Sequence, residues 1–460
     1  MLAKFKKKYI GDWYFYQKYL LLAIPMILQN AITNLVSFLD NIMVGQLGTE
    51  QMSGVAIVNQ LIFVYNLAIF GAVSAASIFG AQYFGKGNHK GHMYSFRFKL
   101  YATLLVTGGA ILLFLTKGSA LISLYLTDTV GNGATDLALQ YGLEYLAIMM
   151  VGLIPFAVNQ SYATNIKETG QTFIPMLASF VAVGTNAILD YLMIFGPFPE
   201  LGVQGAALAT VIARYIEALI VVIWAHIHRG KNRYLEGAYT GFGIPLAELK
   251  AILIKGFPLM MNEVLWAAGM TTVTQCYSVR GLNVVAGLNI ASTITNLFNI
   301  VYLQLGSCIS IVVGQYLGAG KLEDAKDADN KMIVFSVFCC VIMAALMFVV
   351  GGFFPGIYNT TEEIRELATS FIAVSAIIMP FCAFSHASYF TLRSGGKTVV
   401  TFLFDSVFTW VIVVPAAYLL AHFTGLGIVS IYFLVQGTEL IKVIIGYLMV
   451  KSNVWVVQMV

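Results

Sequence analysis

Apolar runs of about 20 residues recur along the whole chain, and no other feature limits its possible folds so strongly. As an α-helix, each run is long enough to cross the roughly 30 Å hydrocarbon core of a bilayer. Of the 460 residues, 59% are hydrophobic and only 10% are charged, which leaves too few polar side chains to cover a soluble domain. Because the runs are apolar on every side, they lack the alternation that is typical of barrel strands. The sequence therefore predicts an all-α polytopic membrane protein.

Hydropathy and charge together predict twelve transmembrane helices. With the N-terminus inside, most of the 26 Lys and Arg residues fall at cytoplasmic helix ends, and only Lys117, Arg280 and Arg365 face the other side. This bias predicts a protein of the cell (inner or plasma) membrane with both termini cytoplasmic. The basic start MLAKFKKKYIGDW, which contains Lys4, Lys6, Lys7 and Lys8, leads into a full-length span without a small-residue cleavage site, so we interpret it as a retained tail. The predicted spans are 18–44, 53–80, 95–117, 137–162, 172–195, 202–227, 250–277, 285–315, 330–350, 364–390, 399–421 and 427–450.

The two halves of the chain repeat one another. A shift of 233 residues superimposes GAQYFGKG (80–87) on VGQYLGAG (313–320), so that glutamine, tyrosine and two glycines coincide. In the later part of each half the shift becomes 225, which places Pro155 on Pro380. Because the offset stays constant within each block, the matches indicate an internal duplication.

Each half holds six predicted spans, so both halves have the same orientation in the membrane. The expected fold is two six-helix lobes related by pseudo-twofold symmetry along the membrane normal, which is a geometry of alternating access. We expect an N-terminal lobe at 1–226, a cytoplasmic linker at 227–249 and a C-terminal lobe at 250–460. A duplicated structural protein without a transport path is the alternative, but isolated carboxylates inside its spans would then be costs without a function.

Four acidic residues lie in the interior of predicted spans. They are Asp40, Asp190, Glu263 and Asp405. A charged group at the bilayer centre costs at least about 2.5–3.5 kcal/mol on insertion scales, so each carboxylate needs a partner or a water-filled cavity.

Other ionisable residues in the spans have simpler explanations. Glu144, Glu439 and Lys442 lie near predicted span ends, where we interpret them as interfacial or snorkelling residues. Arg214 and Glu217 are three residues apart on one predicted helix, a spacing at which they can form an ion pair. A structural salt bridge and a functional role remain alternatives for this pair.

The segment around Asp190 predicts an ion site. Asn186 precedes Asp190 by one helical turn, so both side chains lie on one face. With Asp40 from another helix they would form an oxygen-rich site, and hard cations such as Na⁺ prefer oxygen ligands. A proton is the competing occupant, because desolvation and a second carboxylate both favour the protonated form.

These polar residues belong to one half of the chain alone. The positions that correspond to Asp40, Asn186 and Asp190 in the second half are Val273, Val411 and Pro415, and Thr210 corresponds to Val435. The fold therefore does not require the polar side chains. Chemistry confined to one lobe is typical of a site for a coupling ion.

The second half offers weaker candidates for substrate contact or for a second protonation site. Glu263 and Asp405 are far apart in sequence and have no amide one turn away on the same helix. Trp266 and His386 lie in the same half, and aromatic side chains in a cavity can hold an organic cation by cation–π contact. Ordinary packing is the alternative for both, and a structural hydrogen bond is the alternative for Glu263.

Several motifs resemble those of the multidrug and toxic compound extrusion (MATE) family, within the MOP flippase superfamily, over essentially the whole chain. In the order in which they occur along the sequence, they are LDNIMVGQLG, NAILD, LGVQGAALATVIAR and GQYLGAGK. The resemblance implies a twelve-helix, two-lobed antiporter that exports organic, often cationic drugs in exchange for Na⁺ or H⁺. Some members of the family use an ion site in the N-lobe. The resemblance implies that its residues here are Asp40, Asn186, Asp190 and Thr210, which are also the residues expected to hold any bound Na⁺.

The chain departs from the family's other pattern. Some members use an acidic pair in helices 7 and 10, and Glu263 corresponds only to the first member of that pair. The predicted helix 10 has no interior acidic residue and holds only His386. This difference favours the N-lobe as the coupling site and leaves Na⁺ and H⁺ as alternatives.

Two other functions compete with drug efflux. A lipid-linked oligosaccharide flippase of the same superfamily should carry Lys or Arg in its spans to meet a pyrophosphate, whereas these spans are mainly acidic, with Arg214 the main exception. An enzyme would need clustered histidines, metal-ligand spacing or a catalytic triad, yet the six histidines are scattered and the five cysteines fall in apolar segments. We therefore expect no enzyme activity, no cofactor besides the coupling ion and no nucleic-acid partner, and we expect a monomer surrounded by membrane lipid.

Overall fold

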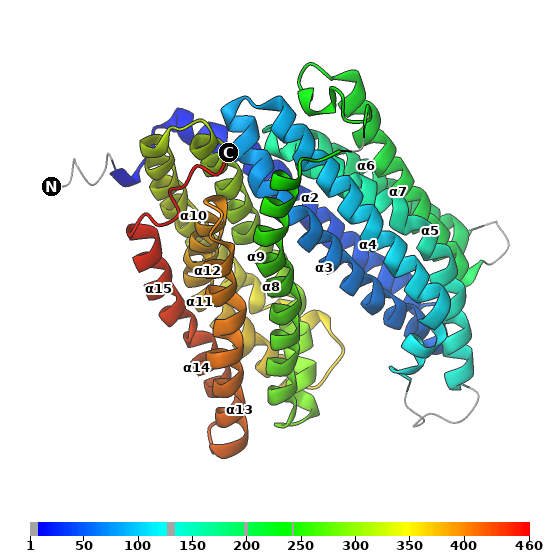
Figure 1. The fold of residues 1–460 in the computed structure, drawn as a ribbon. Helices are drawn as coiled ribbons and strands as arrows, with labels where there is room; N and C mark the ends of the chain where they lie inside the picture. Colours follow the sequence, from blue (N-terminus) through cyan, green and yellow to red (C-terminus); the bar gives the residue numbers. More distant parts are fainter. Residues whose placement is uncertain (1–7, 127–133, 197–200, 242) are drawn as a thin grey trace. The chain divides into compact units, whose positions relative to one another are not determined.

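The computed structural model describes residues 8–126, 134–196, 201–241 and 243–460. Three of the basic residues predicted to be cytoplasmic, Lys4, Lys6 and Lys7, lie outside these ranges. The described residues form helices and connecting turns and contain no β-strand. In the first half the helices are α2 (Trp13–Gly45), α3 (Thr49–Lys86), α4 (His89–Ser123), α5 (Ala134–Glu168), α6 (Phe173–Ile194) and α7 (Gly202–Ile227), drawn from blue to green in Figure 1.

The second half repeats this order of helices. Its regular helices are α8 (Leu246–Ser278), α9 (Leu282–Gly318), α10 (Leu322–Gly351), α11 (Glu362–Ser394), α12 (Thr398–Phe402), α13 (Val414–Phe423), α14 (Ile428–Gly437) and α15 (Glu439–Lys451). Among the described residues, 11 helical segments are long and apolar enough to cross a membrane. The 33-residue α2 supplies the twelfth span. The predicted all-α fold with twelve membrane helices in two six-helix lobes is confirmed.

The chain packs into two compact units. Unit 1 contains residues 1–23, 81–88 and 251–460, and unit 2 contains 24–80 and 89–250. The first turns of α2 and the last turn of α3 therefore pack with the C-terminal half of the sequence. The sequence predicts lobes at 1–226 and 250–460, and that division assigns these two segments to the N-terminal lobe.

Two repeated glycines explain why the end of α3 belongs to unit 1. A Cβ atom at Gly85 would lie 2.0 Å from the carbonyl oxygen of Gln315, and one at Gly318 would lie 1.9 Å from that of Gln82. These contacts are reciprocal, because each glycine faces the glutamine of the other copy of the motif. The amide of Gln82 also donates to the carbonyl oxygen of Ser394 at 2.9 Å. The duplicated GQYxGxG sequence is thus a close backbone crossing of α3 and α9.

The apolar cores lie within the units. In unit 2, α3, α5 and α7 bury a cluster that includes Val58, Leu153 and Ala207. In unit 1, α9, α10 and α11 bury a cluster that includes Met347 and Phe371. Large apolar side chains also cover the outer sides of most helices, as expected where helices face lipid instead of water.

The predicted linker is ordered against unit 2. Tyr234, in the short helix η1 (Arg233–Leu235), is buried against Phe96 of α4. Arg97 donates to the carbonyl oxygen of Ala238 at 2.9 Å and to that of Gly237 at 2.7 Å. Burial raises the pKa of the Tyr234 phenol. The segment is therefore part of the unit 2 structure along this stretch.

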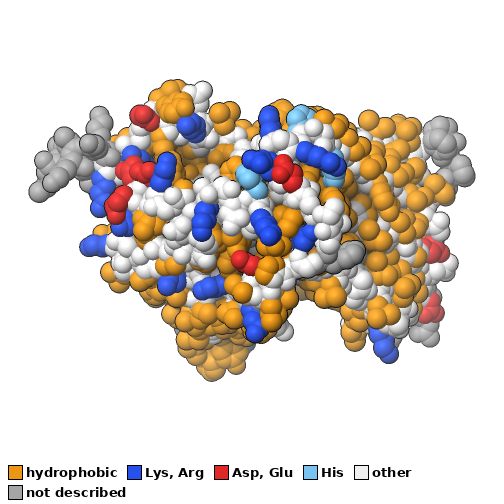
Figure 2. Space-filling view, turned by 45° about the horizontal axis from the view of Figure 1, so that its top comes forward, with side chains coloured by type: hydrophobic (Ala, Val, Ile, Leu, Met, Phe, Trp, Pro, Cys, Tyr) orange, Lys and Arg blue, Asp and Glu red, His pale blue; other side chains and the backbone are white. Residues whose placement is uncertain are grey.

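Charged residues gather at the ends of the helices. Figure 2 looks toward the end of the molecule that is at the top of Figure 1, and Lys and Arg side chains are scattered over its polar surface while hydrophobic side chains cover the flanks. Apolar flanks and charged ends are the distribution that a bilayer requires.

One span is irregular at an acidic residue. The predicted span 399–421 begins as α12 and then widens into two π-helical turns, η3 (Leu403–Val407) and η4 (Thr409–Val413), before α13. Asp405 lies in the first widened turn. Such turns inside helices are frequent at functional sites, because they change the direction of the side chains on either side.

Candidate functional site

The predicted ion site is assembled inside unit 2 from three helices. Asn186 and Asp190 lie one turn apart on α6, and both side chains are buried. The Asn186 amide donates to the Thr210 hydroxyl of α7 at 3.5 Å. Thr210 in turn donates to the carbonyl oxygen of Ala206 at 3.1 Å, which fixes the direction of its hydroxyl.

Asp40 of α2 completes this group, which we call the Asp40 site (Asp40, Asn186, Asp190 and Thr210). The Asp40 carboxyl lies within interaction range of the Asp190 carboxyl. Asp190 is 1% exposed, and neither of its oxygens has a hydrogen-bond partner with good geometry in the described part of the chain. One oxygen of Asp40 is equally unsatisfied. The structure thus brings together the four residues that the sequence singled out.

The geometry of the Asp40 site favours a small cation. Two carboxylates so close together repel one another unless a proton or a metal ion lies between them. The side chains of this site come from three helices and carry carboxylate, amide and hydroxyl oxygens, which are the ligands that hard cations prefer. Tyr145 lies nearby, with its hydroxyl 3.3 Å from the amide oxygen of Asn59. No described Lys or Arg forms an ion pair with Asp40 or Asp190.

Asp405 in unit 1 has a different environment. Lys442 of α15 donates to its carboxylate at 2.7 Å, and Asn262 of α8 donates at 3.0 Å. The amide oxygen of Asn262 accepts from the Ser406 hydroxyl at 2.7 Å. We call this group the Asp405 cluster (Asp405, Lys442, Asn262 and Ser406). Its carboxylate is neutralised by the protein itself.

The Asp405 cluster corrects one prediction and completes another. Lys442 was expected to snorkel toward the interface, but its side chain is buried and holds Asp405. Only Thr438 separates α14 from α15, and Ile428–Lys451 forms one span of 24 residues, so Lys442 lies in the interior of the span and not at its end. Asp405 has no amide one turn away on its own helix, as the sequence shows, and Asn262 supplies one from another helix. Periodicity along one helix cannot show a partner on a neighbouring helix.

The other candidates in unit 1 lie around this cluster without joining its hydrogen bonds. The carboxyl of Glu263, next to Asn262 on α8, is within electrostatic reach of Arg393 and Asp405. His386 hydrogen-bonds the carbonyl oxygen of Cys382 at 2.9 Å and packs on the Tyr302 ring at 4.7 Å between centroids.

Trp266 lies one turn beyond Asn262 on α8 and is 38% exposed. Neither it nor His386 shares a hydrogen bond with Asp405 in the described residues. His386 is nevertheless within electrostatic reach of Lys442 and Asp405.

The expected ion pair of Arg214 and Glu217 does not form. Arg214 lies over the Phe156 ring at 5.2 Å and donates to the carbonyl oxygen of Gly152 at 3.4 Å. Glu217 instead accepts a hydrogen bond from Ser179 of α6. The spacing permits a pair, but the aromatic face and the open carbonyl draw the guanidinium away.

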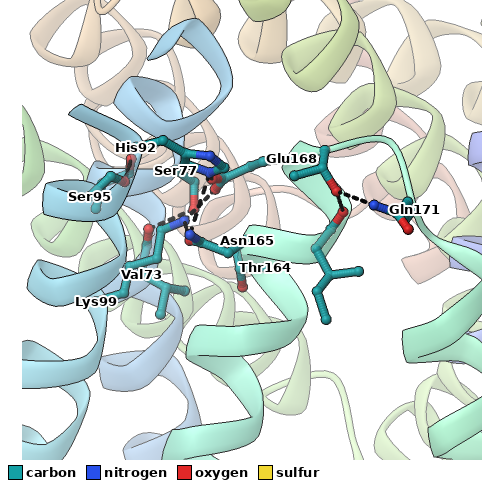
Figure 3. A network of polar contacts seen from close by, with 12 residues as sticks. Val73, Ser77, His92, Ser95, Lys99, Thr164, Asn165, Glu168 and Gln171 are labelled. Carbon is teal, nitrogen blue, oxygen red and sulfur yellow. Dashed lines mark hydrogen bonds and ion pairs between the residues drawn. The ribbon is translucent and has the colours of Figure 1, made fainter. Parts of the chain in front are cut away.

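A further buried ionic network was missed by the sequence analysis (Figure 3). Lys99 of α4 donates to Glu168 of α5 at 2.5 Å and also to the side-chain oxygen of Asn165. His92 lies 3.3 Å from the other carboxylate oxygen of Glu168. A Cβ atom at Gly80 would lie 2.0 Å from that same oxygen, so the absence of a side chain on α3 makes room for the network.

This network is structural in character, because its charges are paired. Lys99 was counted among the basic residues of the cytoplasmic helix ends, but its side chain is fully buried. The available signal was the seven-residue spacing of His92 and Lys99, which places both on one face of α4. Hydropathy alone cannot separate a solvated lysine near a helix end from a buried one.

The comparison with protein families identifies one match. A model of the MatE family matches residues 25–192 and 258–419, one segment in each half of the chain. In the described residues no cluster of three or more His, Cys, Asp or Glu side chains has the arrangement of a metal site.

Similar proteins have been described in bacteria. The chain is 23% identical to a probable multidrug resistance protein NorM of Thermotoga maritima over 413 residues, which is 89% of this chain and 86% of that protein. It is 24% identical to a probable multidrug resistance protein NorM of Halalkalibacterium halodurans, with 89% and 88% covered.

Solved structures share the fold. An outward-facing multidrug resistance MATE family transporter of the MOP superfamily superimposes with a TM-score of 0.86, at 20% identity and with 96% of each chain covered. A MOP superfamily transporter from Pyrococcus furiosus gives a TM-score of 0.85 with the same identity and coverage.

Proposed function

Because the chain belongs to the MatE family, we propose that it is a multidrug efflux antiporter, which exports organic cationic or lipophilic compounds in exchange for Na⁺ or H⁺. It is a multi-pass membrane transporter and not an enzyme. The names of the NorM relatives, which are probable multidrug resistance proteins, support small-molecule drugs as the transported class.

The observation that carries the proposal is the pair of unsatisfied carboxylates in the Asp40 site. Asp190 is buried without a hydrogen-bond donor of good geometry, and Asp40 lies beside it. A buried carboxylate without compensation is strongly unfavourable, so such a site is stable only when a cation or proton occupies it. Occupation therefore changes the energy of the surrounding helices α2, α6 and α7.

The transport cycle follows from this dependence on occupancy. With the site empty, Asp40 and Asp190 repel one another and α2 is pushed away from α6. Entry of Na⁺ or H⁺ removes the repulsion and lets α2 pack against α6, and this change is coupled to substrate release by alternating access. Linkage requires that the ion and the drug weaken each other's binding by the same factor.

Unit 1 supplies the candidates for substrate contact. Of the four acidic residues that the sequence singles out, Glu263 is the one in unit 1 that is not held by the Asp405 cluster, so it is suited to a positively charged drug. Trp266 lies nearby on α8 and is partly exposed, as a ring that stacks on an organic cation must be. We assign Asp405 and His386 to the structure around this surface.

The proposal includes the setting of the protein. The basic residues at predicted cytoplasmic ends favour a cell membrane location with both termini inside. The apolar outer faces of the helices are suited to contact with membrane lipid, and we expect the monomer to be sufficient for transport. No cofactor besides the coupling ion is needed by this cycle.

Reconstituted vesicles test the function directly. Export of a fluorescent organic cation is measured from proteoliposomes under an imposed Na⁺ gradient and, separately, under a pH gradient. We expect transport under one gradient and its loss in Asp40→Asn. Glu144→Gln is the matched control, because Glu144 is a half-buried carboxylate whose hydrogen-bond partners in the described residues are Gln140 and Gln204. Undiminished gradient-driven export by Asp40→Asn would show that the Asp40 site does not couple transport.

A further inference from the structure

A second polar group lies in unit 2 on the same helices as the Asp40 site. Ser179 of α6 donates to the Glu217 carboxylate of α7 and accepts from the Gln29 amide of α2 at 2.8 Å. Asn159 of α5 donates its amide N–H to the same carboxyl and is 2% exposed. We call this group the Glu217 site, and its members are Glu217, Ser179, Gln29 and Asn159.

The Glu217 site has oxygens without donors. The amide oxygens of Gln29 and Asn159 are buried and have no hydrogen-bond partner in the described part of the chain. A buried oxygen without a partner costs about 1–3 kcal/mol, so two of them beside a carboxylate require an explanation. A cation explains both, because it accepts oxygen ligands where a protein donor is lacking.

The charge of Glu217 is not compensated by the protein at close range. No described Lys, Arg or His lies within ion-pair distance of its carboxylate. Arg214 and Lys167 act on it only at longer range. A carboxylate in a membrane helix that has hydrogen bonds but no cationic partner at ion-pair distance indicates a functional site.

The internal repeat shows that the positive charge beside the carboxylate differs between the two units. A shift of 225 residues places Glu217 on Lys442, and the shift of 233 places Gln29 on Asn262. In unit 1 the lysine ammonium at this position lies 2.7 Å from Asp405 and supplies the positive charge. In unit 2 the equivalent helix carries the acid, and no described Lys or Arg lies at ion-pair distance from it as Lys442 does from Asp405.

The position of the Glu217 site relates it to the Asp40 site. Thr210 and Glu217 are seven residues apart on α7, and Asn186 and Ser179 are seven apart on α6, so each pair shares a helix face across two turns, about 10 Å. Helices α6 and α7 run side by side along this length (Figure 1). Glu217 lies nearer the end of α7 that leads into the linker, which is the predicted cytoplasmic end.

We propose that the Glu217 site binds a small monovalent cation, H⁺ or Na⁺, between the Asp40 site and the cytoplasmic end of α7. The cation takes the place that the Lys442 ammonium has in unit 1. The inference rests on the proposed function, because it assumes that the bound cation is the one that drives export. It gives that cation a second binding site in unit 2.

Binding to the purified full-length protein tests the site without transport. In the double variant Asp40→Asn/Asp190→Asn only the Glu217 site remains, and we expect binding of one cation per chain. Radioactive Na⁺ measures the Na⁺ arm, and infrared difference spectra of the carboxyl groups after a pH step measure the H⁺ arm. Adding Glu217→Gln to the double variant should abolish whichever signal is present.

The outcomes separate the site from the function. If the double variant shows neither Na⁺ binding nor a carboxyl signal that depends on Glu217, the site does not exist. If binding persists while reconstituted wild-type protein exports no drug, the proposed function fails and the site stands. Should Glu217→Gln not remain folded, Asn159→Leu removes one unpaired oxygen instead, and we expect cation affinity to fall about tenfold. Unchanged affinity in Asn159→Leu would also overturn the proposal.

Discussion

The same level of the fold carries an acid in unit 2 and a lysine in unit 1. Glu217 and Lys442 are equivalent in the repeat, and so are Gln29 and Asn262, yet only the unit 1 group contains both charges of an ion pair. In unit 1 the chain satisfies its own carboxylate, so Asp405 is held without an external ion. In unit 2 no described Lys or Arg forms an ion pair with the carboxylates of the Glu217 site or the Asp40 site.

This difference teaches how a duplicated scaffold acquires one-sided chemistry. The backbone crossing of α3 and α9 retains the same glycines in both copies, because any side chain there would collide with backbone. Polar side chains inside the lobes are under no such restriction and have diverged. Under the proposed function, unit 2 depends on an external cation, whereas the carboxylate of Asp405 in unit 1 is paired with Lys442.

The largest effect is expected from removing the internal cation of unit 1. Lys442→Met leaves the buried Asp405 carboxylate uncompensated, and breaking a buried pair in this way costs about 3–5 kcal/mol of stability. Thermal unfolding in detergent measures the loss. Lys442→Met combined with Asp405→Asn is the matched control and should recover most of it. If the single variant were as stable as the wild type, the ion pair would not be what distinguishes unit 1.

The backbone crossing of α3 and α9, which both copies of the repeat form, is tested by substituting one of its glycines. Gly318→Ala forces a Cβ atom against the backbone of Gln82, and we expect a loss of about 1–3 kcal/mol from overpacking. The control is Gly108→Ala, since a Cβ atom at Gly108 on α4 meets nothing within 4 Å. Chemical unfolding of both variants gives the difference. Equal stability of the two would mean that close approach does not explain the conserved motif of the repeat.

The dependence of unit 2 on a cation is tested by Asp40→Asn. The substitution removes the repulsion with Asp190 and imitates an occupied site, so the coupling between ion and drug should fall by at least about fivefold. Drug affinity is measured with and without the coupling ion, Na⁺ or H⁺. The wild type should show a difference and the variant should not. Asp405→Asn, whose carboxylate is already neutralised, should retain the difference if it folds.

The sequence predicted the fold and the Asp40 site because their signals are local or repeated. The length of the apolar runs predicts the spans, and the one-turn spacing of Asn186 and Asp190 predicts the polar face of α6. The partners of Lys99 and Lys442 could not be predicted, because an ion pair between two helices depends on their rotation and register. The same limit explains Arg214, whose partner was expected along its own helix and proved to be an aromatic ring on α5.

The smallest effect is expected from Glu217→Gln on stability, and this makes it the sharpest test of the comparison. The amide keeps the size of the side chain and can still accept the Ser179 hydrogen bond, so stability should change by less than about 1 kcal/mol in the absence of cation. The wild type should gain thermal stability as the concentration of the bound cation rises, because ligand binds the folded state alone. The variant should gain less, having lost one site. In unit 1 the Lys442 ammonium already supplies the positive charge, so we expect no such dependence on cation there. An equal gain in the wild type and in Glu217→Gln would contradict the assignment of cation dependence to Glu217.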